Sequence, residues 1–138
     1  MHVSRARETC QLARYGTFPR VESDLREWDY DVYEGRTTRD IRGQVPGWSV
    51  WTSAMIDGES LEDVAGRARR VMDRVLEAAP DDVLLFAHGH ILRVLAACRI
   101  EQPPIIGQVL ALDTATISVL GYERERRVIR RWNIDLLT

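Results

Sequence analysis

The chain has 138 residues, of which 45% are hydrophobic and 29% charged. This balance is typical of one globular domain with a packed core and excludes a disordered or membrane-embedded chain. The formal net charge of −2 provides no general field that would attract nucleic acid or an acidic membrane. A bound anion would therefore need a local group of arginines.

The cysteines and the N-terminal residues favour a reducing, cytoplasmic location. Cys10 and Cys98 lie far apart, match no metal-binding spacing and are expected to be free thiols. The N-terminus lacks the apolar core of a signal peptide, and no apolar run reaches the roughly 20 residues needed to cross a bilayer. We therefore expect neither a membrane nor a nucleic acid as a partner.

The first third of the chain predicts two helices within a loop-rich region. The pattern over Arg5–Tyr15 predicts a helix, and Gly16 is its expected stop. A shorter helix is expected after Thr37 or Thr38, either of which can cap it, and it should end before Pro46.

The best-defined predicted element is a helix over Ser60–Ala79, capped by Ser60 and apolar along one face. Val83–Ala87 is a short unbroken apolar run, which predicts a strand buried on both faces. After His88-Gly89-His90 the helical pattern returns, and it ends before Pro103.

The C-terminal part predicts a different arrangement. Thr116–Tyr122 and Val128–Trp132 flank a short charged turn, which indicates an antiparallel hairpin at a sheet edge. The preceding helix, strand, tight turn and helix form an α/β unit. We therefore expect residues 1–138 to belong to a single α/β domain without internal repeats.

The turn at His88-Gly89-His90 is the first candidate site. A residue that ends a buried parallel strand before a helix faces the crevice where such sheets bind ligands, and the first N–H groups of the helix suit an anion. Gly89 lets backbone and ligand approach closely, and His88 could hold a phosphate oxygen or move a proton. A purely structural turn stays open as an alternative. A His-x-His metal site also stays open, although no set of carboxylates or thiolates accompanies it.

Two further candidates precede this turn. Arg5 and Arg7 stand near a helix start, where a cation opposes the helix dipole; a bound anion would explain them, and so would simple exposure to water. Glu27 lies in an aromatic-rich loop beside Trp28 and Tyr30. A carboxyl group next to bulky rings can serve as a proton donor, although a solvated acidic loop would show the same pattern.

Four motifs, in the same order, resemble those of the histidine phosphatases, a phosphoglycerate-mutase-like superfamily. Ser4-Arg-Ala-Arg-Glu-Thr9 resembles the S-x-x-R-A-x-x-T helix start, and Gly58-Glu-Ser60 resembles the GES before the next helix. Leu25-Arg-Glu27 with Tyr33-Glu-Gly35 resembles the L-x-E-x-x-x-G-x-x-E-G loop without its middle glycine. Leu85–His90 resembles the strand-borne V-S-H-G, with alanine in place of serine. The resemblance covers nearly the whole chain.

The resemblance implies a phosphoglycerate-mutase-like three-layer α/β/α sandwich, here without its first strand and helix. By position, Arg5 would bind the phosphoryl oxygens, and Glu27 would be the general acid that protonates the leaving oxygen. His88 would stabilise the phosphoryl group in transfer, with Gly89 allowing its close approach.

In this family a histidine of an Arg-His-Gly motif takes the phosphoryl group, and neither a metal nor another cofactor is used. The sequence contains no Arg-His-Gly, so we expect the chain to begin late in the family pattern. His2 is a less favoured substitute nucleophile.

These expectations favour a phosphomonoesterase that, in its complete form, hydrolyses a small phosphorylated metabolite through a phosphohistidine. One alternative is a catalytically inactive module that binds phosphate or a partner. Another is phosphoglycerate-mutase-type phosphoryl transfer, for which the sequence shows no added basic insertion. The expected partner is the phosphorylated substrate or inorganic phosphate, and exposed apolar surface could support a homo-oligomer.

Overall fold

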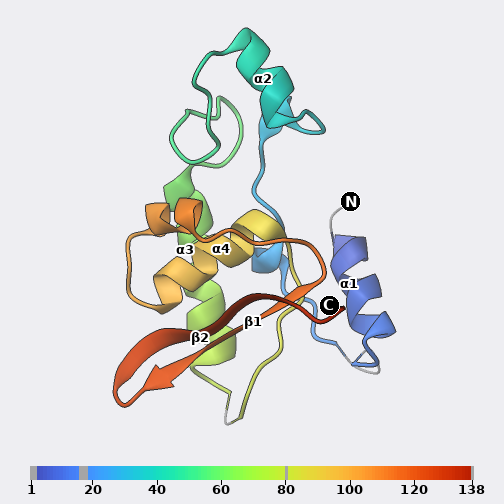
Figure 1. Cartoon of the computed structure of the whole chain (residues 1–138), viewed down its shortest axis with the longest axis vertical. Helices are drawn as coiled ribbons and strands as arrows, with labels where there is room; N and C mark the ends of the chain where they lie inside the picture. Colours follow the sequence, from blue (N-terminus) through green and yellow to red (C-terminus); the bar gives the residue numbers. More distant parts are fainter. Residues whose placement is uncertain (1–2, 16–18, 80, 138) are drawn as a thin grey trace.

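A computed structural model describes residues 3–15, 19–79 and 81–137 of the chain. Its main elements are α1 (Val3–Leu12), α2 (Thr38–Gln44), α3 (Leu61–Val71), α4 (Gly89–Arg99), β1 (Thr116–Glu123) and β2 (Arg126–Asp135). Short 3-10 helices cover Ser23–Leu25, Asp31–Tyr33 and Pro104–Val109, and a π-helical turn, Met72–Leu76, follows α3. Figure 1 shows α2 at one end of the molecule and the hairpin of β1 and β2 at the other.

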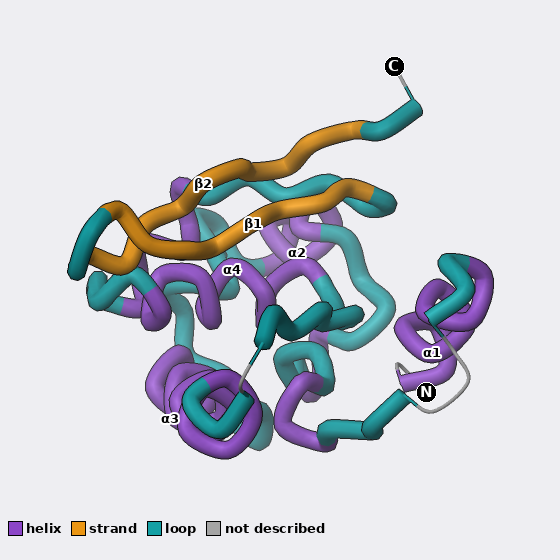
Figure 2. Tube along the Cα trace, turned by 90° about the horizontal axis from the view of Figure 1, so that it is seen from below, coloured by secondary structure: helices purple, strands orange, loops and turns teal. Residues whose placement is uncertain are grey.

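The core lies where α3 packs against α4. Val64 and Val71 on α3 and Ile91 and Val94 on α4 are completely buried. The spacing of seven residues on α3 and of three on α4 places each pair on one face of its helix, and burying these two apolar faces against each other removes them from water. Figure 2 shows α4 between α3 and the hairpin, with α1 set to one side.

The predicted caps are confirmed. Ser60 caps α3 through a reciprocal pair of hydrogen bonds: Asp63 N–H donates to Ser60 Oγ (3.1 Å), and Ser60 N–H donates to Asp63 Oδ2 (2.9 Å). Thr37 caps α2 by accepting from the N–H of Asp40 (3.1 Å). Both caps satisfy N–H groups that have no partner inside the helix.

Two other predicted elements are also present. The helix after His88 is α4, and the C-terminal strands form the expected antiparallel hairpin. The first helix is displaced, since it begins at Val3 and ends at Leu12. Its predicted stop, Gly16, lies outside the described residues. Within the described ranges, no helix has the length and apolar character needed to span a membrane.

The predicted strand over Val83–Ala87 is wrong. In the part of the chain that the structure describes, the sheet consists of β1 and β2, and no backbone hydrogen bond involves Val83–Ala87. Val83 and Leu84 are 37% and 54% exposed, so this run is not buried on both faces. A strand requires a neighbour that exchanges ladder hydrogen bonds, which hydrophobicity alone does not supply. The described chain is α/β, with helices and a two-stranded sheet.

Candidate active site

The carboxylate of Glu27 lies at the N-terminus of α4. Its Oε1 accepts hydrogen bonds from the N–H groups of Trp28 and Ile91 (2.9 Å each), and its Oε2 accepts one from the N–H of His90 (3.1 Å). The first N–H groups of a helix lack partners within the helix, and the side chain of Glu27 satisfies two of them. Two of the N–H groups expected to suit a bound anion are therefore occupied by Glu27.

His88 and Gly89 lie beside this carboxylate. His88 is the N-cap residue of α4, with an extended backbone (φ −121°, ψ 165°), and it is half-buried. Gly89 is the first residue of α4, and a Cβ atom built there would lie 4.0 Å from Glu27 Oε2. Glu27 and the predicted residues His88 and Gly89 thus lie at the same end of α4, and their roles remain predictions.

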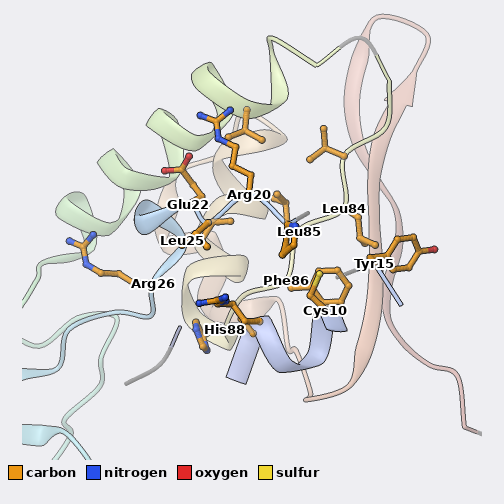
Figure 3. Close-up of a pocket in the computed structure, with 16 residues that line it drawn as sticks. Cys10, Tyr15, Arg20, Glu22, Leu25, Arg26, Leu84, Leu85, Phe86 and His88 are labelled. Carbon is orange, nitrogen blue, oxygen red and sulfur yellow. The ribbon is translucent and has the colours of Figure 1, made fainter. Parts of the chain in front are cut away.

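A groove of about 220 Å³ lies between α1, the loop over residues 19–26 and residues 83–88. Its wall is largely apolar, and Figure 3 shows Leu25, Phe86 and Cys10 around it, with His88 at one end. Three arginines, Arg7, Arg20 and Arg26, also line this groove, together with the carboxylate of Glu22. The three guanidinium groups outnumber the one carboxylate on the groove wall, and with His88 they give the groove the chemistry needed to attract a small anion.

The predicted role of Arg5 remains a prediction. Arg5 lies on α1 with an exposed side chain, and its carbonyl oxygen accepts a hydrogen bond from the hydroxyl of Thr9 (2.9 Å). The residues of α1 that line the groove are Ala6, Arg7 and Cys10. His2, the less favoured nucleophile, lies outside the described residues.

The imidazole of His90 is enclosed by aromatic rings rather than open to the groove. The rings of Trp28, Tyr30 and Trp51 meet it edge-on, with centroids 6.1, 5.6 and 5.6 Å away. The hydroxyl of Tyr30 and Nδ1 of His90 form a hydrogen bond. The two histidines of the turn therefore have different surroundings; the sequence pointed to His88 as the candidate but did not predict the aromatic cluster around His90.

Burial controls the protonation of this aromatic cluster. Burial lowers the pKa of His90; the negative charge of Glu27 opposes that shift and the positive charge of Arg93 adds to it. Burial raises the pKa of Tyr30, and the charges of Glu27 and Glu34 raise it further. The phenol therefore stays protonated near neutral pH, where it can donate to the neutral imidazole.

An acidic and basic cluster supports the loop that precedes Glu27. The buried carboxylate of Asp24 accepts two hydrogen bonds from Arg70 (3.0 and 3.1 Å) and one from Arg74 (2.7 Å). The bond from Arg70 is the main reason that the pKa of Asp24 falls from 3.8 to about 2, and Arg74 lowers it further while burial opposes the shift. This cluster fixes the loop to α3 and its π-helical turn.

Arg67 was not predicted from the sequence; it is a buried arginine on α3 that contacts Glu59 and the loop over residues 24–27. A signal was present, because Arg67 falls on the helix face marked by Val64 and Val71. An arginine at such a position must find buried partners. Among the described residues, no group of three His, Cys, Asp or Glu side chains is arranged to hold a metal ion.

Comparison with known proteins identifies the family. The pattern of the histidine phosphatase superfamily (branch 1) matches residues 2–135. The chain therefore belongs to the histidine phosphatase superfamily.

Within that superfamily the chain is similar to an acid phosphatase of Mycobacterium tuberculosis, with 38% identity over 120 residues that span 86% of this chain and 59% of the relative. It is 36% identical to a sedoheptulose 1,7-bisphosphatase of Saccharomyces cerevisiae over 133 residues, covering 79% of this chain and 49% of the relative. The chain thus spans 49% to 59% of the length of these relatives.

Solved structures confirm the expected fold class. The product of a Mycobacterium tuberculosis open reading frame superposes with a TM-score of 0.87 at 36% identity, covering 94% of this chain and 67% of that one. A mycobacterial glucosyl-3-phosphoglycerate phosphatase, solved with inorganic phosphate, gives a TM-score of 0.74 at 27% identity over 88% of this chain and 68% of the other. The described helices and hairpin are therefore those of the histidine phosphatase fold.

Proposed function

We propose that the complete protein is a phosphomonoesterase, which hydrolyses a small phosphorylated metabolite through a phosphohistidine. The observation that carries this proposal is the placement of the Glu27 carboxylate, beside His88 and Gly89 at the start of α4. The groove that ends at His88 is lined by Arg7, Arg20 and Arg26 and offers room for a phosphoryl group. Relatives named as phosphatases support the same reaction class.

The reaction takes place in two steps. The phosphoryl group leaves the substrate oxygen for a histidine nitrogen, while Glu27 gives its proton to the departing alcohol. Water then attacks the phosphohistidine, inorganic phosphate is released, and Glu27 takes back a proton from the water. His88 and the groove arginines stabilise the charge on the phosphoryl oxygens in both steps. We assign no residue of this sequence as the nucleophile, because the sequence contains no Arg-His-Gly.

The geometry distinguishes the two oxygens of Glu27. Oε1 accepts two backbone hydrogen bonds, whereas Oε2 accepts one and faces the position where Gly89 has no side chain. With one backbone hydrogen bond instead of two, Oε2 is the oxygen with more acceptor capacity left for a proton. We assign Oε2 as the oxygen that carries the proton.

The test compares two substrates that differ in their need for a general acid. p-Nitrophenolate leaves without protonation, whereas an alkoxide must be protonated as it leaves. Glu27→Gln should lower kcat/KM for an alkyl phosphate by about 10²- to 10⁴-fold, which is the usual size of a general-acid contribution. The loss for p-nitrophenyl phosphate should be far smaller. Glu62→Gln, which changes an exposed glutamate on α3, should leave both rates unchanged.

The inactive alternative predicts a different set of rates. If the purified chain hydrolyses p-nitrophenyl phosphate and His88→Ala abolishes the reaction, the inactive module is excluded. If the chain binds inorganic phosphate but hydrolyses neither substrate, the proposed hydrolysis fails for this chain. Equal losses on both substrates in Glu27→Gln would reject the general-acid role.

A further inference from the structure

Arg67 is an unusual member of the α3 core because it is charged and only 1% exposed. A buried charge is strongly unfavourable unless it is paired and its hydrogen-bonding groups are satisfied. Arg67 therefore needs specific partners, and what those partners support indicates its role.

Glu59 is the charged partner of Arg67. Arg67 Nε donates to Glu59 Oε2 (2.7 Å) and Arg67 Nη2 donates to Glu59 Oε1 (2.8 Å), which is a two-bond fork between guanidinium and carboxylate. Such a fork fixes the guanidinium plane as well as its charge. A lysine would keep the charge and lose the fork.

The remaining donors of Arg67 hold the backbone of the loop that carries Glu27. Nη1 donates to the carbonyl oxygens of Asp24 (2.7 Å) and Arg26 (2.8 Å), and Nη2 reaches the carbonyl oxygen of Glu27 itself (3.4 Å). One buried side chain thus binds three carbonyl groups within four consecutive residues. The backbone on the N-terminal side of the Glu27 carboxylate is fixed to α3.

Glu59 fixes the same loop on the C-terminal side of Glu27. The N–H of Asp29 donates to Glu59 Oε1 (3.1 Å), and Trp28 Nε1 donates to the Glu59 carbonyl oxygen (2.7 Å). The N–H of Glu59 donates in turn to the carbonyl oxygen of Asp29 (3.0 Å). Arg67 and Glu59 therefore clamp residues 24–29, and the side chain of Glu27 reaches from the middle of this segment to α4.

We propose that Arg67 is a positioning residue that acts through Glu59 and the loop carbonyl groups to hold the Glu27 carboxylate against the N–H groups of His90 and Ile91. The chemical consequence rests on the proposed function, since the position of Glu27 matters for proton transfer. Small displacements of a catalytic group are costly to the rate, about 10²-fold for 1 Å.

Amide hydrogen exchange tests the positioning without requiring activity. In Arg67→Lys, the amides of His90 and Ile91 should exchange at least about tenfold faster, because their acceptor is no longer held in place. The amides of Leu95 and Ala96, farther along the same helix, should keep their wild-type rates. Arg69→Lys is the matched control, because Arg69 is an exposed arginine on α3, the helix that carries Arg67. Unchanged exchange at His90 and Ile91, or an equal increase throughout α4, would overturn the proposal.

The substrate comparison gives a second readout that a merely structural role would not produce. In Arg67→Lys, kcat/KM for an alkyl phosphate should fall at least about tenfold more than for p-nitrophenyl phosphate, because the general acid is displaced. Equal losses on both substrates would overturn the role. If the wild-type chain hydrolyses neither, the proposed function fails, and the exchange rates at His90 and Ile91 still decide whether Arg67 positions Glu27.

If Arg67→Lys does not fold, Glu59→Gln takes its place in the exchange experiment. The amide keeps the shape of the side chain and one oxygen acceptor but removes the charge from the fork. The same selective increase in exchange at His90 and Ile91 is expected, with a smaller size. No change at these two amides in a folded Glu59→Gln would contradict the clamp.

Discussion

Single side chains in this protein join elements that are distant in the sequence. Glu27 connects a loop to the N-terminus of α4, and Arg67 connects that loop to α3. Asp24 adds a third connection through Arg70 and Arg74. Because each contact pairs a charge with several donors or acceptors, the loop that carries Glu27 is held in place by polar bonds as well as by packing.

Asp24 should make the stability of the protein depend on pH in the acid range. Its pKa is about 2 in the folded chain and 3.8 in the absence of these contacts. A lowered pKa contributes stability that is fully present above pH 3.8 and is lost as the pH falls toward 2. Wild type should therefore lose about 1–2 kcal/mol more than Asp24→Asn between pH 6 and pH 2, measured by urea unfolding. Parallel pH profiles for the two proteins would show that the arginines do not stabilise this carboxylate.

The sequence predicted Glu27 and His88 but not how they are held. Residue type and the order of the motifs are visible in the amino-acid sequence, so both candidates could be predicted from it. The bond between Glu27 and Ile91 joins residues that are far apart in the sequence, and no local pattern predicts such a contact. Arg67 was detectable only as a charge on an apolar helix face, a signal that does not name its partners.

Among the helices and strands, the sequence predicted best those whose hydrogen bonds join residues that are close together in the chain. The caps of α2 and α3 and the course of α4 follow from residues within a few positions of each helix end. The run Val83–Ala87 carries an equally clear apolar signal but forms no strand in the described part of the chain. Its conformation depends on a neighbouring strand, which the run itself cannot specify.

The Ser60 cap should contribute measurably to stability. Ser60→Ala removes the acceptor for the N–H of Asp63 and the reciprocal arrangement around it. The expected loss in the free energy of unfolding is about 1 kcal/mol, seen as a lower urea midpoint with an unchanged slope. Ser60→Thr, which keeps the hydroxyl, should retain most of the wild-type stability. Equal loss in both variants would assign the effect to something other than the cap.

At the scale of the whole molecule, stability should be uneven. The α3 and α4 faces are fully buried, whereas α1 buries Cys10 and leaves Leu12 78% exposed. Figure 2 shows α1 apart from the packed centre. An element with little buried apolar surface opens at a lower free energy than the core.

This difference should appear in hydrogen exchange at neutral pH. Amides of Glu8–Leu12 in α1 should exchange at least about 100-fold faster than those of Val94–Cys98 in α4. The comparison within one protein provides its own control, since temperature and pH are shared. Equal protection of the two helices would show that α1 opens only with the core.

We expect His88 and the groove beside it to receive a phosphoryl group, while His90 has a structural role in its aromatic cluster. The most direct measurement is an NMR titration with inorganic phosphate that follows the imidazole C–H signals of both residues, with chloride as the control salt. The His88 signals should shift saturably with phosphate and not with chloride, and those of His90 should stay in place. A titration that leaves His88 unmoved, or that shifts His90 instead, would contradict the account.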